Sequence, residues 1–193
     1  HFQELKKQLE KKTIGKIRYC KIIWTTGGRA GENFSQNWMN YKKLGGGVLL
    51  NYGSHVIDYL EWLLSPISSI SADLKILKKN SAPKKTDAED YCQFSSLLQD
   101  GVPTQVIISN VLYGGEGHTI EIYGSRGTLK LSNNNLFDPI KGFTLTKINT
   151  KDKMSGYAKT LPTIKILRFN ENSIELILAD GRIISAPLSK FPS

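Results

Sequence analysis

Three consecutive glycines at 45–47 precede a segment whose polar residues have the types and spacing of an active site. At about 100° per residue of helix, Asn51, His55 and Asp58 fall on one side of this segment. Glycines at a helix start let another backbone or a ligand approach closely. Histidine has an unperturbed pKa of about 6.5 and suits proton transfer near neutral pH. The pattern therefore favours His55 as a general base, with Asn51 one turn before it and Asp58 one turn after it.

The opposite side of the same segment is apolar, so a second interpretation stays open. An ordinary amphipathic helix also packs one face and leaves the other solvated. On that interpretation the polar residues have no catalytic role. The apolar residues expected to pack are Leu49, Val56, Leu60, Leu63 and Leu64.

The order of residues in this segment resembles the C-terminal domain of the Gfo/Idh/MocA family, which are nicotinamide-dependent sugar and cyclitol oxidoreductases. In that family a GGG-x-L-x-D-x-G-x-H-x-x-D pattern opens a helix beside the active site. The matching residues are Gly45, Gly46, Gly47, Leu49, Asn51, Gly53, His55 and Asp58. The family's usual aspartate is replaced by Asn51. Two further stretches, FQELKKQLEKKTIGKI near the start and IEIYGSRGTL at 120–129, extend the resemblance over roughly residues 1–131.

The resemblance implies an NAD- or NADP-dependent oxidoreductase that acts on a hydroxyl of a sugar, sugar nucleotide or cyclitol. It implies catalytic roles for His55 and Asn51 and cofactor contacts at Gly46 and Gly47. It requires no metal. The substrate contacts that it implies are Asp58, Trp38, Arg29, Tyr41 and Tyr113.

Asn51 keeps a second function open. Its amide can hydrogen-bond a histidine ring or a substrate hydroxyl, but it cannot supply the charge of an aspartate. Asp58 could supply a carboxylate instead, or could simply face solvent. A non-catalytic sugar-sensing or scaffold protein on the same fold is therefore the alternative hypothesis.

Length and composition are those of a globular protein in a reducing compartment. The chain has 193 residues, of which 39% are hydrophobic and 22% charged, and this length favours one domain over 1–193. No apolar run approaches the ~20 residues that span a bilayer, and the charged start is not a secretion signal. Cys20 and Cys92 lie in predicted strands and are expected to be buried free thiols. We therefore expect a cytoplasmic protein.

The net charge of +9 raises the question of a nucleic-acid partner. Lysines number 21 against 5 arginines, although arginine is the better bidentate ligand of phosphate and guanine. The lysines are dispersed and are not interleaved with aromatic residues that could stack on bases. A carbohydrate substrate, including an anionic uronic acid or sugar nucleotide, explains the basic surface better than nucleic acid does.

The remaining sequence predicts an α+β fold with a large, mainly antiparallel, open-faced sheet and helices packed on one face. The resemblance implies the architecture of the C-terminal domain of glyceraldehyde-3-phosphate dehydrogenase. Helices are expected at the start of the chain, over 37–44 and over 48–64. Asp100-Gly101 and Asp180-Gly181 are hairpin signals. The expected strands are 16–26, 67–77, 88–98, 103–113, 119–123, 127–131, 143–148, 163–168, 173–178 and 182–186.

The sequence contains no G-x-G-x-x-G between a strand and a helix, so it encodes no dinucleotide-binding fold. The family's N-terminal cofactor domain is not in this chain, and we expect the isolated chain to be inactive. His118 stands at a strand start without a partner at useful spacing, and we expect it to be structural. A broad apolar free face of the sheet would favour a homodimer or homotetramer, the family's common mode of assembly.

Overall fold

The computed structural model describes residues 1–31, 37–78, 86–135, 141–149, 164–170, 173–178 and 183–187. The chain divides into two compact units, His1–Thr150 and Lys151–Ser193. The length favoured one domain, and the structure gives two units, each of which is described by itself below. The first unit carries every residue that the sequence proposed for a site.

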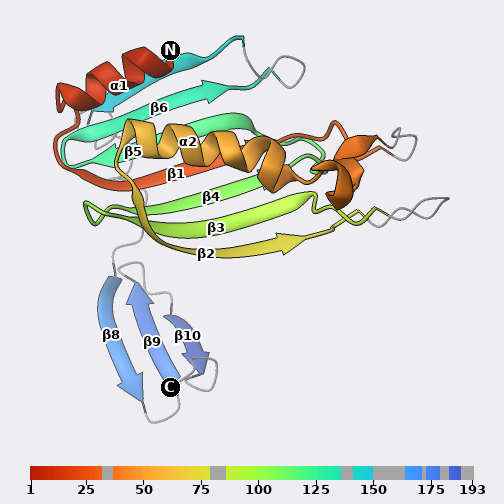
Figure 1. The fold of residues 1–193 in the computed structure, drawn as a ribbon. Coiled ribbons are helices and arrows are strands. Elements are labelled where there is room, and N and C mark those ends of the chain that lie inside the picture. The colour runs from red at the N-terminus through yellow and green to blue at the C-terminus, as the bar shows by residue number, and fades with distance from the viewer. Residues whose placement is uncertain are drawn as a thin grey trace. The chain divides into compact units, whose positions relative to one another are not determined.

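The first unit is built on a seven-stranded sheet with the order β2-β3-β4-β1-β5-β6-β7 (Figure 1). The strands are β1 Ile17–Thr25, β2 Ile67–Lys75, β3 Tyr91–Leu98, β4 Pro103–Ser109, β5 Gly117–Gly124, β6 Gly127–Asn133 and β7 Thr144–Asn149. All seven overlap strands that the sequence predicted.

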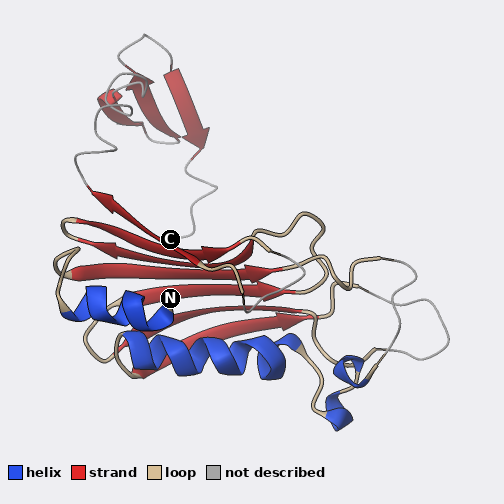
Figure 2. Cartoon of the chain, turned by 90° about the horizontal axis from the view of Figure 1, so that it is seen from above, coloured by secondary structure: helices blue, strands red, loops and turns tan. Residues whose placement is uncertain are grey.

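Two α-helices, α1 Phe2–Glu10 and α2 Ser54–Leu63, lie on the same face of the sheet (Figure 2). Their apolar sides pack onto it. Leu5 of α1 and Val56, Leu60 and Leu63 of α2 are buried, as the apolar side of the predicted helix requires. These helices and the sheet enclose one core, to which the strands contribute mainly Ile22, Phe94, Val106, Ile108, Ile120, Ile122, Leu129 and Leu131.

The helical segments between β1 and α2 are short and are not α-helical, unlike the helices that the sequence predicted. Two 3-10 turns, Trp38–Asn40 and Lys42–Leu44, replace the single helix expected over 37–44. A π-helix, Leu49–Gly53, runs directly into α2. The helix expected over 48–64 is therefore present, but its first turn has a wider hydrogen-bond pattern than an α-helix.

The hairpin predicted at Asp100-Gly101 is confirmed. Gly101 has a φ of +82°, and the backbone N–H of Leu98 donates to the carbonyl of Val102 across the turn at 3.0 Å. In β3 and β4 buried and exposed residues alternate, because successive side chains point to opposite faces of a sheet. The short-range pattern thus specified both the strands and their connection.

The sheet is mixed, which corrects the expectation of a mainly antiparallel sheet in one respect. β1 pairs with β4 in parallel and with β5 in antiparallel orientation, and the other described neighbours in this sheet are antiparallel. Hairpin signals report only pairings between strands that follow each other in sequence. The β1–β4 pairing joins Cys20 to Thr104, too far apart in sequence for such a signal.

The sheet face away from the helices carries polar side chains at its centre. The carboxylate of Glu121 accepts from Lys21 Nζ at 2.7 Å and from Lys130 Nζ at 3.2 Å. The hydroxyl of Tyr123 donates to Glu121 at 2.7 Å, and the Tyr19 ring lies 5.8 Å from the Tyr123 ring. A connected network of charges and phenols therefore occupies the middle of this face.

The second unit is a three-stranded antiparallel sheet with the order β10-β9-β8. Its strands are β8 Ile164–Asn170, β9 Ser173–Leu178 and β10 Ile183–Pro187. All three were predicted. The Asp180-Gly181 turn lies outside the described residues.

Candidate active site

The three glycines join the second 3-10 turn to the π-helix by a tight backbone path. Gly45 ends the 3-10 turn with a φ of +77°. The N–H of Gly46 donates to Tyr41 O and that of Gly47 donates to Met39 O, both at 3.0 Å. A Cβ on Gly46 would lie 2.5 Å from Met39 O. Gly45 is therefore required by its backbone conformation and Gly46 by close packing, and the N–H groups of Gly46 and Gly47 are already engaged.

Asn51 lies in the π-helix and directs its side chain toward the start of the helix. Its Nδ2 donates to the carbonyl of Gly47 at 2.9 Å, and its backbone N–H donates to the same oxygen at 3.2 Å. Among the hydrogen bonds of the described residues, none joins Asn51 to His55. The structure therefore places the two predicted catalytic residues one turn apart without a direct bond between them.

His55 lies in the first turn of α2, with an exposed side chain, at a cavity of about 300 Å³. Helical spacing brings Tyr59 to the same cavity one turn later. Aromatic side chains from the sheet and from α1 form most of the remaining wall. The lining residues are His1, Phe2, Trp24, His55, Tyr59, His118 and Phe143.

His118 is buried in this wall and has partners that its sequence position did not reveal. Its ring stacks on Trp24 with centroids 4.1 Å apart and an interplanar angle of 5°. Its Nε2 shares a 2.9 Å hydrogen bond with the Tyr59 hydroxyl. Burial lowers the pKa of His118 to about 4 and raises that of Tyr59 well above its usual value. Both groups are therefore uncharged at neutral pH. Of the three histidines that line the cavity, His1 and His55 are exposed and His118 is buried.

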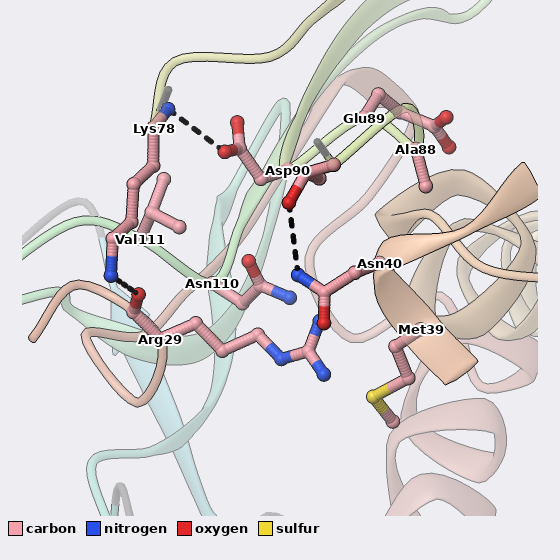
Figure 3. Close-up of a pocket in the computed structure, with 10 residues that line it drawn as sticks. Arg29, Met39, Asn40, Lys78, Ala88, Glu89, Asp90, Asn110 and Val111 are labelled. Carbon is pink, nitrogen blue, oxygen red and sulfur yellow. Dashed lines mark hydrogen bonds between the residues drawn. The ribbon is translucent and has the colours of Figure 1, made fainter. Parts of the chain in front are cut away.

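Arg29 lines a different, smaller pocket of about 20 Å³, together with Asn40, Lys78 and Asn110 (Figure 3). Figure 3 shows its side chain reaching toward Asn40 and Met39. Burial lowers the pKa of the guanidinium. The buried Oδ1 of Asn110 has no hydrogen-bond partner in the described part of the chain. Arg29 is thus a semi-buried residue of a second pocket and does not line the His55 cavity.

The other predicted substrate residues also lie outside the His55 cavity. Trp38 is 47% exposed and Tyr113 is 76% exposed. Tyr41 links the two 3-10 turns, and Asp58 is exposed on α2. Tyr52, whose ring lies 4.6 Å from that of Trp24, is the aromatic residue that joins the π-helix to the cavity wall. The structure therefore gathers only His55 from the predicted set at this cavity.

Sequence reasoning missed Trp24, Tyr59 and Phe143, which form the wall beside His55. Tyr59 could have been found, because it follows His55 by four residues on the same predicted helix. Trp24 and Phe143 come from β1 and from the segment before β7, and no local pattern connects them. Neither position carries a sequence signal for this cavity.

Metal ligation finds no support in the described residues. No group of three or more histidine, cysteine, aspartate or glutamate side chains there could hold a metal ion. Cys20 and Cys92 are buried free thiols, as expected, and burial raises the pKa of Cys20 to about 12. In the described part of the chain, no helix is long and apolar enough to cross a membrane.

Comparison with a protein of known sequence agrees with the family resemblance. An uncharacterized oxidoreductase of Synechocystis sp. is 37% identical over 139 residues, which cover 68% of this chain and 38% of that protein. The chain thus spans about two fifths of this relative's length.

Solved structures share the fold. Levoglucosan dehydrogenase in complex with NADH and levoglucosan superposes with a TM-score of 0.63 at 20% identity, covering 76% of this chain and 43% of that one. A super-repressor mutant of Gal80p from Saccharomyces cerevisiae gives a TM-score of 0.60 at 15% identity, covering 78% and 44%. Residues 2–130 match the profile of the GFO/IDH/MocA C-terminal domain. The chain belongs to the GFO/IDH/MocA oxidoreductase family and contains its C-terminal domain.

Proposed function

We propose that this chain is the substrate-binding and oligomerisation part of an NAD(P)-dependent oxidoreductase that acts on a hydroxyl of a sugar, sugar nucleotide or cyclitol. The observation that carries the proposal is the position of His55. It lies exposed at an aromatic-walled cavity, on the helix that follows the family's glycine motif. A cavity of about 300 Å³ is large enough for a single sugar ring.

The residues of this chain supply proton transfer and binding. A nitrogen of His55 takes the hydroxyl proton while the carbon–oxygen double bond forms. The hydrogen on that carbon leaves as hydride, for which a bound nicotinamide supplies the acceptor. Trp24 and Phe143 offer flat apolar faces that suit the C–H side of a sugar ring. His118 and Tyr59 remain uncharged beside it.

We assign most of the NAD or NADP contacts to a dinucleotide-binding domain of the whole protein. This chain has no strand–glycine–helix unit to cradle phosphates. Gly46 and Gly47 can contribute backbone surface but no free N–H. The NADH complex of levoglucosan dehydrogenase, a structure of the same fold, supports nicotinamide use. We further propose that the enzyme is cytoplasmic, because the two cysteines of this chain are buried free thiols.

The test is a substrate screen with the full-length protein. Purified protein is incubated with NAD⁺ or NADP⁺ and a panel of aldoses, uronic acids, nucleotide sugars and cyclitols, and reduced nicotinamide is measured. The proposal expects saturable turnover on at least one of these classes with one of the two cofactors. Failure of every class, in a protein shown by calorimetry to bind the cofactor, would contradict it.

The second candidate is a sugar-sensing or scaffold protein on the same fold. Asn51 favours it, because its amide bonds to Gly47 O and offers His55 no carboxylate. The likeness to the Gal80p super-repressor shows that this fold also occurs in a repressor. Saturable sugar binding without any nicotinamide reduction would favour this candidate over the enzyme.

A further inference from the structure

We propose that Glu89 and Asn51 are positioning residues that together fix the direction of His55. In this proposal Glu89 supplies the negative charge at the start of the His55 helix, and Asn51 supplies a neutral donor that closes its first turn. The inference rests on the proposed function, because it assigns His55 the reacting role. Neither residue lines the His55 cavity, so both act through the backbone.

Glu89 caps the start of the helix from the segment that precedes β3. Its Oε1 accepts the N–H of Leu49 at 3.2 Å, and its carbonyl accepts the N–H of Val48 at 3.0 Å. The first N–H groups of a helix have no partner within it, and a negative charge is favourable there. Glu89 is half-buried, and it satisfies two of these donors at once.

Gly47 makes room for the Glu89 carboxylate. A Cβ at Gly47 would lie 2.1 Å from Glu89 Oε1, and the φ of +109° is one that L-residues rarely adopt. The third glycine of the motif is therefore needed for Glu89 to reach the helix. This links the glycine motif to a carboxylate about forty residues away in the sequence.

Asn51 binds the other side of the same glycine. Its Nδ2 donates to Gly47 O at 2.9 Å. An ionised aspartate has no hydrogen to donate, so a carboxylate at this position would face the Gly47 carbonyl without a bond. It would also add a second negative charge to the turn that Glu89 already caps. An asparagine is therefore the residue that fits a helix start capped by Glu89.

The bonds of Glu89 to Val48 and Leu49, together with the bond of Asn51 to Gly47, form a clamp at the start of the π-helix. The π-helix connects this clamp to the orientation of His55. Its hydrogen bonds span five residues and not four, so the turn holds one more residue than an α-helical turn. If it reverted to α-helix, the residues after it would rotate by about 100° relative to the clamp. His55 follows the end of the turn at Gly53 by two residues. The clamp at Gly47 therefore sets whether His55 faces the cavity.

The test compares Asn51→Asp and Glu89→Gln with the wild type in the full-length protein. Amide hydrogen exchange over residues 48–56 reports the clamp without any need for turnover. We expect at least about tenfold faster exchange in Asn51→Asp, because the hydrogen bond to the Gly47 carbonyl is lost and the new carboxylate is repelled by that oxygen and by Glu89. Glu89→Gln keeps an acceptor oxygen but loses the charge, and should give a smaller increase.

Turnover on the substrate found by the screen supplies the second readout. Asn51→Asp should lower kcat about tenfold with little change in KM, because misplacement of a base affects the reacting step more than binding. Adding Glu89→Gln to Asn51→Asp should recover part of both losses by removing one of the two charges. Asn149→Asp, the same chemical change on the exposed edge strand β7, is the matched control and should resemble the wild type.

Two outcomes would overturn the positioning role of Asn51 and Glu89. If Asn51→Asp leaves exchange unchanged and raises kcat, the carboxylate acts on His55 directly and the positioning role is wrong. If Asn51→Asp does not fold, Glu89→Gln decides by exchange alone, and unchanged exchange there overturns the proposal. Failure of the proposed function shows differently: either the screen finds no turnover on any class, or His55→Ala keeps full turnover, whatever the exchange rates of the Asn51 and Glu89 variants.

Discussion

Two of the histidines at the cavity, His55 on α2 and His118 on β5, have opposite environments, and the environment decides what each can do. His55 is exposed, so a substrate in the cavity can reach its ring. His118 is 4% exposed, stacked on Trp24 and bonded to Tyr59. Its pKa of about 4 keeps it neutral at physiological pH. Of these two histidines, only His55 is placed to act as a base, and His118 shapes the wall.

Stability in acid should report the buried state of His118. Its pKa is about 4 in the folded protein and about 6.5 in the unfolded chain. As the pH falls through this window, the unfolded chain binds the proton first, so folding weakens. The slope is at most about 1.4 kcal/mol per pH unit. The lost stability returns as the pH rises back through this window, and it is fully present above about 6.5.

His118→Phe tests this assignment by urea unfolding at several pH values across the window. The phenyl ring keeps the stack on Trp24 but cannot titrate, so that part of the slope should disappear. The variant should also lose about 1–3 kcal/mol at neutral pH, because the Tyr59 hydroxyl is left without its partner. An unchanged acid slope would mean that His118 is not the buried titrating group.

At the residue scale, the spacing of residues in the sequence identified only those residues of the candidate site that lie on one helix. His55 and Asn51 were identified because one helix carries both, and their side of the helix followed from the 3.6-residue period. The Asn51 amide, which could have bonded to the His55 ring or to a substrate hydroxyl, donates to the Gly47 carbonyl instead. Glu89, Trp24 and Phe143 approach the helix through tertiary contacts, which no local pattern encodes.

At the element scale, the glycine motif connects a 3-10 turn to a π-helix. Gly45 provides a left-handed residue with open space around it, whereas Gly47 provides a left-handed residue packed against Glu89. Substitution of Gly45 therefore introduces backbone strain alone, whereas substitution of Gly47 introduces backbone strain and a steric clash with Glu89. The two positions are a matched pair for mutation.

Gly47→Ala should destabilise the protein by roughly 2–3 kcal/mol, measured by chemical denaturation. The left-handed backbone costs about 1–2 kcal/mol for a residue with a Cβ. In addition, the Glu89 side chain must move away and give up its bond to Leu49. Gly45→Ala should show the backbone cost alone, because nothing lies within 4 Å of the added Cβ. Equal losses in the two variants would show that Glu89 does not pack on Gly47 as described.

The strands themselves were predictable because alternation and turn residues act locally. The β3–β4 hairpin followed from the run of alternating residues and from Asp100-Gly101. The parallel pairing of β1 with β4 did not, because Cys20 and Thr104 meet only after the intervening chain has folded. The π-helix was also invisible, since its residues have the same apolar spacing as an α-helix.

At the scale of the whole molecule, the free face of the sheet bears on assembly. Burial would raise the pKa of Glu121, but hydrogen bonds from Lys21, Tyr123 and Lys130 outweigh it and lower the pKa to about 2. Glu121 is therefore ionised at physiological pH and held by two lysines. Such a face can pair with a second copy of itself through polar and aromatic contacts.

We expect the full-length protein to sediment as a homodimer or homotetramer that uses this face. Ile107 lies on β4 between Ile23 and Gln93 and is only partly buried in the single chain. Ile107→Lys should therefore dissociate the assembly, because each subunit would bring an extra positive charge to the contact. A matched change at a partly buried position away from the face, Gln8→Lys on α1, should leave the mass unchanged. A monomeric wild type, or an Ile107→Lys variant that still assembles, would contradict this use of the face.

The central claim is that His55 is the general base of a nicotinamide-dependent oxidoreductase. The most direct measurement is kcat of His55→Ala in the full-length enzyme, on the substrate identified by the screen and at saturating cofactor. Loss of a positioned base should lower kcat by about 10²–10⁴-fold. The unfolding midpoint should stay near that of the wild type, because the side chain is exposed while Val56 and Leu60 hold the helix. Turnover within about twofold of the wild type would show that His55 does not carry out the proton transfer.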